Sequence, residues 1–564
     1  MPDMFGRFSL SLFVAIAGGV FYILAKAYNA RKIVYKLRRQ GLPMPPFSWA
    51  TGHMLAMKPF MEKLPADAIT NYTVTELAYS LNKEAFYLDF WPLSEPLLIL
   101  TTPDMASQLT QQFNPLKPSV IENAFAGLTG GPNLFTMPDV PWKRWRAIFN
   151  PGFSPSYMLQ QTPKIVDECR VFCEKMRARV RQNQMFYLEE DTLRLTLDVI
   201  GVVTLDTHFR YQEFTSWIPE SLRALIEWTS FGTELNPFNR WNPMRPYKLW
   251  YHGRKINKYI EAELDKRFVE RRYSNDSKRD TRSVKSIVAL ALDSYMAEEN
   301  ASGASSDATT LDETFKHYAC AQIRLFLFAG HDTTSSTMVY AFHLLATNPD
   351  CLTRIRAEHD QVFGAGTSPD RVGDLLSADP NLLNQLTYTT ACIKEALRLF
   401  PPASAMRVGG PDTVLVGSDG TRYPTAGCSV WGIHLAIQRN PAVFPQPNRF
   451  IPDRWLPMTL PGDPLHPAKG AWRPFEFGPR NCVGQTLAMA EIKILLAMTT
   501  RAFDFRPAYD EWDRLHPPGH LGGAGAIRTA LGDRAYQVEG GGGGAHAANK
   551  YPCRVRMVGD GEKA

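Results

Sequence analysis

The sequence predicts a mainly α-helical protein with small β-sheets. Apolar residues recur with a period near 3.6, as in helices, over five segments: 155–185, 245–272, 312–347, 350–363 and 384–399. Shorter segments have the composition of β-strands, and these are 85–101, 413–416, 534–538 and 553–558. The two kinds of segment do not alternate regularly, so a doubly wound parallel sheet is not expected.

Composition fits a large globular protein and argues against three other classes of protein. Hydrophobic residues make up 45% of the 564 residues, and the net charge is +6. The basic residues form no concentrated stripe beside a recognisable reading element, so nucleic-acid binding is not expected. The eight cysteines are scattered without CxxC pairs, which argues against a zinc site, and a disulfide framework is not expected in so large a core.

The N-terminus predicts a membrane anchor. Residues Phe8 to Ala25 include no charged side chain, and as a helix these 18 residues would span roughly 27 Å, close to a bilayer core of about 30 Å. Basic residues follow the span between Lys26 and Arg39, so the positive-inside rule keeps the rest of the chain in the cytoplasm. The alternative is a cleaved signal peptide, whose basic end should precede the apolar run.

The same features divide the chain into three parts. Residues 1–28 are expected to be the anchor, with its transmembrane helix at about 8–25, and residues 29–50 a basic, proline-rich hinge. Residues 51–564 are expected to form one catalytic domain. Within it, the polar segments 274–285 and 300–310 are expected to be surface loops. The glycine run at 539–549 is expected to be a flexible loop.

The segment FEFGPRNCVGQ (475–485) places one cysteine among residues that suit a thiolate. Gly478 and Gly484 allow tight turns, and the helix predicted after Cys482 has a dipole that favours a negative charge at its start. Phe475 can cover the sulfur, and Arg480 can neutralise a nearby anion. A buried structural cysteine in a loop explains these residues equally well, and the residues alone leave both interpretations open.

Three further motifs have ordinary explanations when taken singly. The sequence AGHDTT (329–334) lies inside the apolar segment 312–347, where Gly330 is expected to weaken the helix locally. EALR (395–398) could be a solvated acid–base pair one helical turn apart. WKRWR (142–146) could be an interfacial amphipathic helix.

Taken together, the motifs resemble the cytochrome P-450 family. FEFGPRNCVG matches the family's haem loop, Phe-x-x-Gly-x-Arg-x-Cys-x-Gly, at every defined position. The resemblance implies the P-450 fold, haem b as cofactor, and Cys482 as the axial ligand of the haem iron, with Phe475 and Arg480 beside the cofactor. The resemblance extends from the proline hinge to the last strands, and the chain is most similar to the microsomal members of the family from fungi. The part after Asp504 is longer than usual.

The resemblance also assigns roles to the other motifs. Asp332 and Thr333 resemble the acid–alcohol pair that relays protons during catalysis. Trp142 and Arg146 would face one haem propionate, and Arg407 would face the second. The structural network of the family would consist here of Glu395, Arg398 and Arg454.

The expected activity is that of a monooxygenase anchored in the endoplasmic reticulum membrane as a single-pass protein. It would insert one oxygen atom from O2 into a small apolar organic substrate, in fungal secondary metabolism. Only 82 residues follow Cys482, too few for a flavin domain, so a separate NADPH–cytochrome P-450 reductase is the expected electron donor. Basic residues Lys143 and Arg144 are expected on its docking face.

Two other functions remain open at this point. One is a same-fold enzyme that rearranges hydroperoxides, although such enzymes often lack the pair formed here by Asp332 and Thr333. The other is a haem sensor without turnover. Segments 115–137 and 208–252 are expected to line the substrate pocket, and their aromatic residues suit a neutral molecule. The sequence does not choose among terpenoids, polyketides, sterols and modified peptides.

Overall fold

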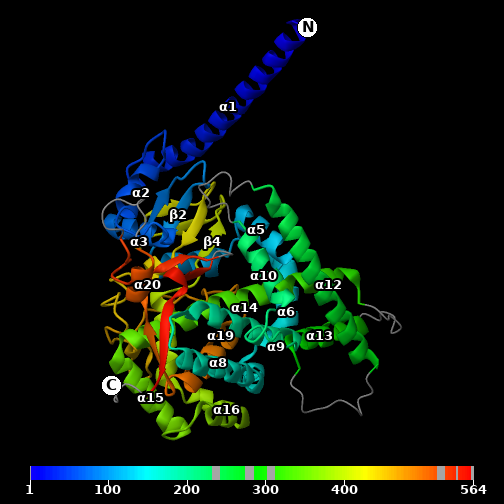
Figure 1. The fold of residues 1–564 in the computed structure, drawn as a ribbon. Helices are drawn as coiled ribbons and strands as arrows, with labels where there is room; N and C mark the ends of the chain where they lie inside the picture. Colours follow the sequence, from blue (N-terminus) through cyan, green and yellow to red (C-terminus); the bar gives the residue numbers. More distant parts are fainter. Residues whose placement is uncertain are drawn as a thin grey trace.

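The computed structural model describes residues 2–230, 242–273, 285–301, 311–517, 527–540 and 544–559. Helices dominate this part of the chain, and the strands form small sheets at its edges (Figure 1). The predicted fold class is therefore confirmed.

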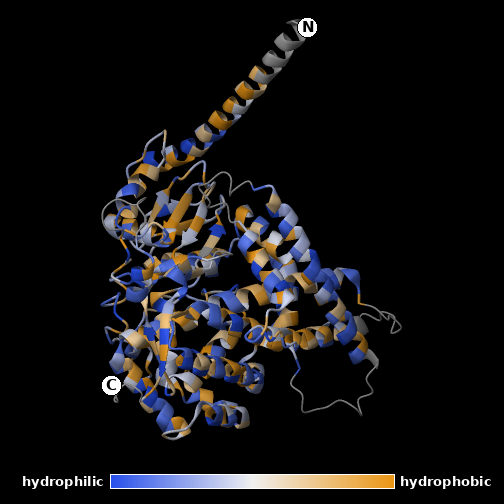
Figure 2. Ribbon diagram, viewed as in Figure 1, coloured by the Kyte–Doolittle hydropathy of each residue, from blue (hydrophilic) through white to orange (hydrophobic). Residues whose placement is uncertain are grey.

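The first helix, α1 (Pro2–Arg39), extends away from the body for most of its length (Figure 1). Its segment Phe13–Arg39 is, by length and composition, able to cross a membrane, and Figure 2 shows apolar residues along it. Near its C-terminal end, buried Arg31 forms an ion pair with buried Asp89 of the body. Residues 29–39, expected within the hinge, are thus helical, and the proline-rich stretch follows them.

The largest sheet has the strand order β1-β2-β7-β4, with bounds Ala85–Leu88, Leu97–Leu100, Ser429–Gly432 and Ala405–Val408. Strands β1 and β2 pair in antiparallel fashion with Ala85 opposite Leu100, β2 and β7 are parallel, and β4 is antiparallel to β7 with Arg407 opposite Val430. Arg407 therefore lies on an edge strand of this sheet.

Three smaller sheets complete the β-structure of the described residues. Strands β5 (Val414–Val416) and β6 (Arg422–Pro424) form one pair, and β9 (Gln537–Glu539) and β10 (Ala545–Ala547) form another. A third sheet has the order β3-β11-β8, with bounds Phe186–Tyr187, Pro552–Met557 and Phe503–Pro507.

The helices of the body surround α14 (Glu313–Thr347). The others of eight or more residues are α2 (Met54–Met61), α3 (Thr70–Leu81), α5 (Ser119–Thr129), α6 (Asp139–Phe149), α8 (Thr162–Gln182), α9 (Leu188–Leu205), α10 (Trp217–Trp228), α12 (Met244–Tyr273), α13 (Ile287–Ala301), α15 (Pro349–Phe363), α16 (Pro369–Ala378), α17 (Thr387–Leu399) and α19 (Gln485–Thr499). Shorter helical pieces are α4 (Pro103–Ser107), η1 (Gln108–Phe113), η2 (Asn150–Phe153), α7 (Pro155–Gln160), η4 (Pro380–Asn384), α18 (His434–Gln438), η5 (Pro452–Trp455), α20 (Tyr509–Leu515) and η7 (Ala548–Lys550).

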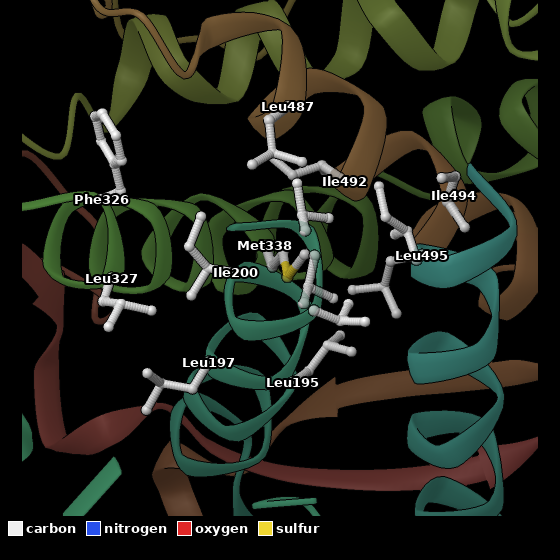
Figure 3. Packing of buried hydrophobic residues seen from close by; sticks show 14 of the residues in the cluster. Leu195, Leu197, Ile200, Phe326, Leu327, Met338, Leu487, Ile492, Ile494 and Leu495 are labelled. Carbon is white, nitrogen blue, oxygen red and sulfur yellow. The ribbon is translucent and has the colours of Figure 1, made fainter. Parts of the chain in front are cut away.

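The main core forms where α9, α14 and α19 meet (Figure 3). Ile200 of α9 packs so close to Gly330 of α14 that a Cβ at Gly330 would lie 2.8 Å from the Ile200 Cδ1. Helix α14 nevertheless runs without a break from Glu313 to Thr347. The glycine allows close packing of the two helices.

Most predicted segments agree with the structure, and the differences are local. The helix expected at 155–185 is divided at Gln161 into α7 and α8, and the β-like segment 85–101 is two strands. Residues 274–284, 302–310 and 541–543 lie outside the described residues. For the rest of the glycine run the flexible-loop prediction is wrong, since Glu539 and 545–547 belong to paired strands.

Candidate active site

The loop that contains Cys482 is fixed by hydrogen bonds and by a neighbouring helix. The Cys482 N–H donates to the carbonyl of Phe475 at 2.9 Å, and the Asn481 N–H donates to the carbonyl of Gly478 at 3.1 Å. Gly478 has φ +136°, and a Cβ there would lie 2.6 Å from the Thr110 carbonyl oxygen of η1. Glycine is therefore required at 478 for both backbone and steric reasons.

Several groups around the Cys482 sulfur favour a negative charge. The Cys482 side chain is exposed to solvent, yet desolvation by the atoms around it raises the pKa of its thiol, while the backbone N–H groups of Gly484 and Gln485 and the guanidinium of Arg146 act to lower it. Arg146 is held there because it donates to Asn481, to the carbonyl oxygen at 3.1 Å and to Oδ1 at 3.2 Å. Arg146 thus contacts the cysteine loop. From the sequence, Arg146 is expected to face a haem propionate, and this contact was not predicted.

Next to this loop, cations gather with few anions to neutralise them. Arg480 donates to the Met137 carbonyl at 2.8 Å and to Asp139 Oδ1 at 2.6 Å, and lies over the Trp142 ring at 4.8 Å. Burial lowers the pKa of Arg407, and Arg480 lowers it further. Trp142 and Arg480 are therefore neighbours, as are Arg480 and Arg407.

A lysine that sequence reasoning missed belongs to the same cluster. Desolvation lowers the pKa of Lys117 well below its usual value, and the charges of Arg407 and Arg480 lower it further, against the opposing effect of Glu476. The Lys117 ammonium lies 4.1 Å from the centre of the Phe135 ring. No sequence motif marks this residue, because a lysine in a proline-rich loop is ordinarily solvated.

This cluster fits the carboxylates of a haem. The Nε atoms of Arg407 and Arg480 are buried and have no hydrogen-bond partner among the described residues. The carboxylate of Glu476 is already shared with Arg473 at 2.6 Å and with His434 at 3.6 Å. Two further carboxylates would supply the missing acceptors and charge, and haem offers two propionates.

Helix α14 presents a short exposed face in an otherwise buried stretch. From Ala319 to Leu345, every described residue is buried except Ala329, Gly330 and Thr333. The Thr333 hydroxyl donates to the Ala329 carbonyl at 2.9 Å. Asp332 is buried and accepts a hydrogen bond from His546 Nε2 at 3.0 Å, so its carboxyl group is turned toward β10.

Aromatic side chains border the exposed face. The ring of Phe328, which precedes Ala329, lies 5.8 Å from that of Phe125, and Phe125 lies 4.5 Å from Phe135. Phe125 and Phe135 come from the segment 115–137 that was expected to line the substrate pocket. The segment 115–137 and helix α12, which begins within the expected pocket region 208–252, also border one cavity of about 600 Å³. The residues that line this cavity are Gly127, Gly130, Leu249, Trp250, Gly253, Arg254, Asn257, Lys258, Glu261 and Arg324. Residues 231–241 of that region lie outside the described residues.

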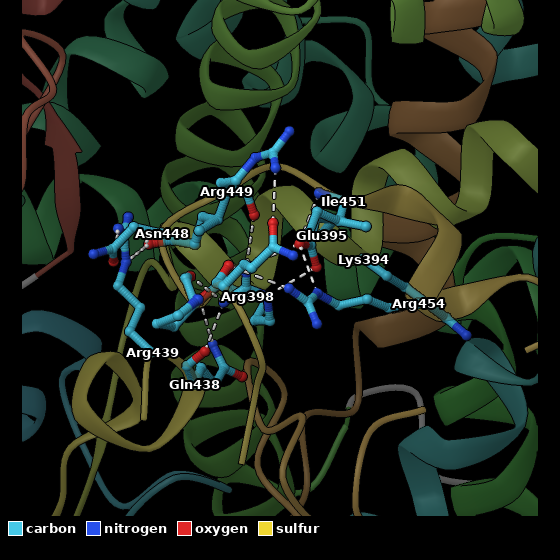
Figure 4. A network of polar contacts seen from close by, with 12 residues as sticks. Lys394, Glu395, Arg398, Gln438, Arg439, Asn448, Arg449, Ile451 and Arg454 are labelled. Atoms are coloured by element: carbon cyan, nitrogen blue, oxygen red, sulfur yellow. Dashed lines mark hydrogen bonds and ion pairs between the residues drawn. The ribbon is translucent and has the colours of Figure 1, made fainter. Parts of the chain in front are cut away.

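The structure brings Glu395, Arg398 and Arg454 together in the interior (Figure 4). Arg398 donates to both carboxylate oxygens of Glu395 at 2.8 Å, and Arg454 Nε donates to Glu395 Oε1 at 3.2 Å. All three side chains are inaccessible to solvent. Arg398 also donates to the carbonyls of Gln438, Pro447 and Arg449. The network therefore joins α17 to residues 438–454, which precede the cysteine loop in the sequence.

Comparisons with known proteins agree with this geometry. The family model described as Cytochrome P450 matches residues 77–525. The cytochrome P450 monooxygenase polC of Polytolypa hystricis is 37% identical over 560 residues, which cover 99% of this chain and 96% of that protein. The cytochrome P450 monooxygenase acrF of Aspergillus aculeatus is 32% identical and covers 83% of this chain and 93% of its own. The crystal structure of the cytochrome P450DA heme domain has a TM-score of 0.65 at 21% identity, over 92% of this chain and 97% of that one, which is evidence for the fold alone.

Proposed function

The chain belongs to the cytochrome P450 family of monooxygenases, and we propose that it oxidises a small apolar organic molecule of fungal secondary metabolism. One oxygen atom of O2 enters the substrate, and electrons come from a separate NADPH–cytochrome P450 reductase. The fungal monooxygenases that it resembles support the assignment to secondary metabolism. The observation that carries the substrate class is the aromatic cluster of Phe125, Phe135 and Phe328 beside the exposed face of α14.

Haem b is the proposed cofactor, and it would supply the activation of O2. Cys482 would ligate its iron as the thiolate, helped by the N–H groups of Gly484 and Gln485 and by Arg146. Lys117, Arg407 and Arg480 would hold its propionates. Phe475 lies on the same loop, and its carbonyl oxygen fixes the Cys482 backbone.

Asp332 and Thr333 are the proposed proton-handling pair. Thr333 lies on the exposed face of α14, where its hydroxyl can donate one hydrogen bond and accept others. Asp332 is adjacent but buried, and His546 keeps the pKa of its carboxyl below the usual value, although burial alone would raise it. Asp332 can therefore accept protons from the interior side, while Thr333 holds them where the reaction occurs.

We also place the body on the cytoplasmic side of the endoplasmic reticulum membrane, with α1 as the anchor. Its apolar residues and the basic residues that follow support this topology. Lys143 and Arg144 of α6 are exposed and are proposed to contact the reductase. Arg144 is already paired with Glu298 of α13 at 3.0 Å, so Lys143 should contribute more.

The variant Thr333→Ala tests the proposed chemistry. Haem content and substrate-induced spectra should persist, because alanine keeps the helix. NADPH oxidation should continue with more hydrogen peroxide and less product. Thr347→Ala is the matched control, since Thr347 makes the same bond to a carbonyl four residues earlier, at 2.9 Å, near the end of α14.

The same assay separates the alternatives. A hydroperoxide-rearranging enzyme would convert a hydroperoxide without reductase, equally well with and without Thr333. A sensor would not oxidise NADPH when reductase and substrate are present. Unchanged product per NADPH in Thr333→Ala would contradict the role of Thr333. The substrate for this assay is the compound that gives the largest shift in a spectral binding screen of fungal small molecules.

A further inference from the structure

The cavity of about 600 Å³ between α5, α12 and α14 has a basic lining that the proposed reaction does not use. Three cationic side chains line it, and these are Arg254, Lys258 and Arg324. Glu261 is the acidic residue of the lining, so positive charge is in excess there. The volume is that of a site for a small organic molecule rather than for a single ion.

Arg324 of α14 is the buried cation of this lining. It is 2% exposed, and desolvation lowers its pKa to about 10, which leaves the side chain charged at neutral pH. Its Nη1 donates to Asn257 Oδ1 at 3.1 Å and its Nη2 donates to the Leu128 carbonyl, and both acceptors are neutral. Within the described part of the chain, its Nε has no hydrogen-bond partner and no carboxylate forms an ion pair with it. A buried guanidinium without a counter-charge is costly.

Arg439 shows how a structural arginine is satisfied in the same interior. Its Nε and Nη2 donate to the Leu399 carbonyl at 3.0 and 2.7 Å, and its Nη1 donates to Asn448 Oδ1 at 3.1 Å. The guanidinium also lies 5.1 Å from the centre of the Phe400 ring. Every nitrogen of the Arg439 guanidinium is therefore bonded, whereas Arg324 keeps a free Nε beside a cavity.

Two glycines that line the cavity keep space open beside the Arg324 guanidinium. A Cβ at Gly253 of α12 would lie 3.2 Å from Nη2, and a Cβ at Gly130 would collide with Nη1. Gly130 also has φ +83°, a conformation that favours glycine. The cavity can therefore reach the buried charge.

This cavity lies away from the exposed face of α14. Arg324 and Thr333 are about 2.5 helical turns apart on α14, so their side chains point to opposite sides of the helix. A molecule held by Arg324 therefore leaves the face at Thr333 free.

We propose that the cavity binds an apolar organic acid as a second ligand, with its carboxylate against Arg324. A carboxylate supplies the missing counter-charge and can accept from the free Nε–H and from the guanidinium N–H groups that are not yet used. Arg254 and Lys258 are exposed and add positive charge at the rim, and Leu249 and Trp250 provide an apolar wall. This site goes beyond the proposed oxidation, because it includes none of the residues assigned to the cofactor or to proton handling.

Calorimetric titration of the haem-loaded full-length protein with diphenylacetate tests the proposal. The acid should bind the wild type at least about tenfold more tightly than its neutral amide, diphenylacetamide, does. Arg324→Gln should abolish this preference, because glutamine keeps two N–H donors but has no charge. The proposal is wrong if the acid does not bind the wild type, or if the acid and the amide bind equally.

Gly253→Ala is a second variant that keeps the charge. Alanine is the better helix former, so the melting temperature should not fall. Its methyl group would occupy the space beside Nη2, so diphenylacetate should bind about tenfold more weakly. Wild-type affinity in this variant would show that the acid does not bind against Arg324.

Two exposed lysines of α12 separate a defined site from general attraction to a basic surface. Lys258 lines the cavity, whereas Lys255 lies over the Trp217 ring at 4.8 Å. Lys258→Gln should weaken binding of the acid about threefold, and the matched control Lys255→Gln should leave it unchanged. Equal effects of the two substitutions would contradict a site at this cavity.

The absorption spectrum of the haem tests the position of the acid. Diphenylacetate should bind without the shift that compounds of the spectral screen produce, because Arg324 and Thr333 point to opposite sides of α14. Such a shift would place the acid over the haem and would overturn the second site. These measurements need no turnover, so the proposal can fail while the monooxygenase function stands. Absence of both product formation and NADPH oxidation would contradict that function alone.

Discussion

Replacement of Glu395 by glutamine should destabilise the protein far more than its small change in shape would indicate. The carboxylate accepts five hydrogen bonds: two from Arg398 at 2.8 Å, one from Arg454 at 3.2 Å, one from Trp455 Nε1 at 2.9 Å and one from the Ile451 N–H at 3.0 Å. Glutamine keeps one carbonyl oxygen and turns the second acceptor into a donor. It also removes the only negative charge in this network.

The magnitude follows from burial. Glu395, Arg398 and Arg454 are inaccessible to solvent, so Glu395→Gln leaves two guanidinium groups buried without a counter-charge. The loss of one partner from a buried ion pair costs about 3–5 kcal/mol. An unfolding entropy of about 2 cal/mol/K per residue gives roughly 1 kcal/mol/K for a body of this size, so the melting temperature should fall by about 3–5 °C.

The assay is thermal unfolding of the haem-loaded protein at one scan rate. Glu298→Gln is the matched control, because Glu298 forms an ion pair with Arg144 in which both side chains are about half exposed. Such a pair contributes about 0–1 kcal/mol, so this variant should melt within about 1 °C of the wild type. Equal losses in the two variants would refute the reasoning that burial sets the cost.

Three further predictions test the ligand, the anchor and the electron donor. Cys482→Ser should lose the red-shifted spectrum of the reduced carbonyl complex, whereas the control Cys351→Ser, at a half-buried position on α15, should keep this spectrum. If Cys482→Ser keeps the spectrum, another group binds the iron. Deletion of residues 1–28 should release the body from membranes with its haem, since Arg31 stays to pair with Asp89. Deletion of residues 1–39 should also lower the melting temperature, because Asp89 is left buried without its partner, and equal stability of the two truncated proteins would contradict this. Lys143→Glu should slow reduction by the reductase several-fold at low salt, and more than Arg144→Glu does, because Glu298 already neutralises Arg144; rates that do not depend on salt would exclude a basic docking face.

Local sequence patterns predicted much of the fold. The helix at 312–347 could be predicted because its apolar residues recur at the spacing of a helix, and in the structure most of it is buried. The boundary at Gln161 could not be read from the same periodicity, since the apolar positions continue through it. The packing role of Gly330 could not be predicted for a related reason. The contact that requires a glycine there comes from Ile200, and nothing near Gly330 in the sequence indicates α9.

The site could be predicted only where a motif is local. The cysteine loop and the pair Asp332–Thr333 lie within short segments of sequence, so a resemblance could assign them. The contact of Arg146 with Asn481 could not be predicted, because the resemblance assigns Arg146 only toward a propionate. Lys117 was missed because its character depends on Arg407 and Arg480, which are brought to it by the edge strand β4 and the cysteine loop. Electrostatic environment is a property of the assembled fold.

His546 is the clearest case of a residue that no local pattern could reveal. In the sequence it follows a run of glycines, and such a run ordinarily indicates a flexible loop. The structure gives the glycines a different reason, because side chains at 540 and 544 would occupy the space of His546 and Asp332. If flexibility were their purpose, Gly544→Ala would disturb only the loop. If close approach is their purpose, the same variant should push β10 away from α14 and lower the melting temperature of the haem-loaded protein.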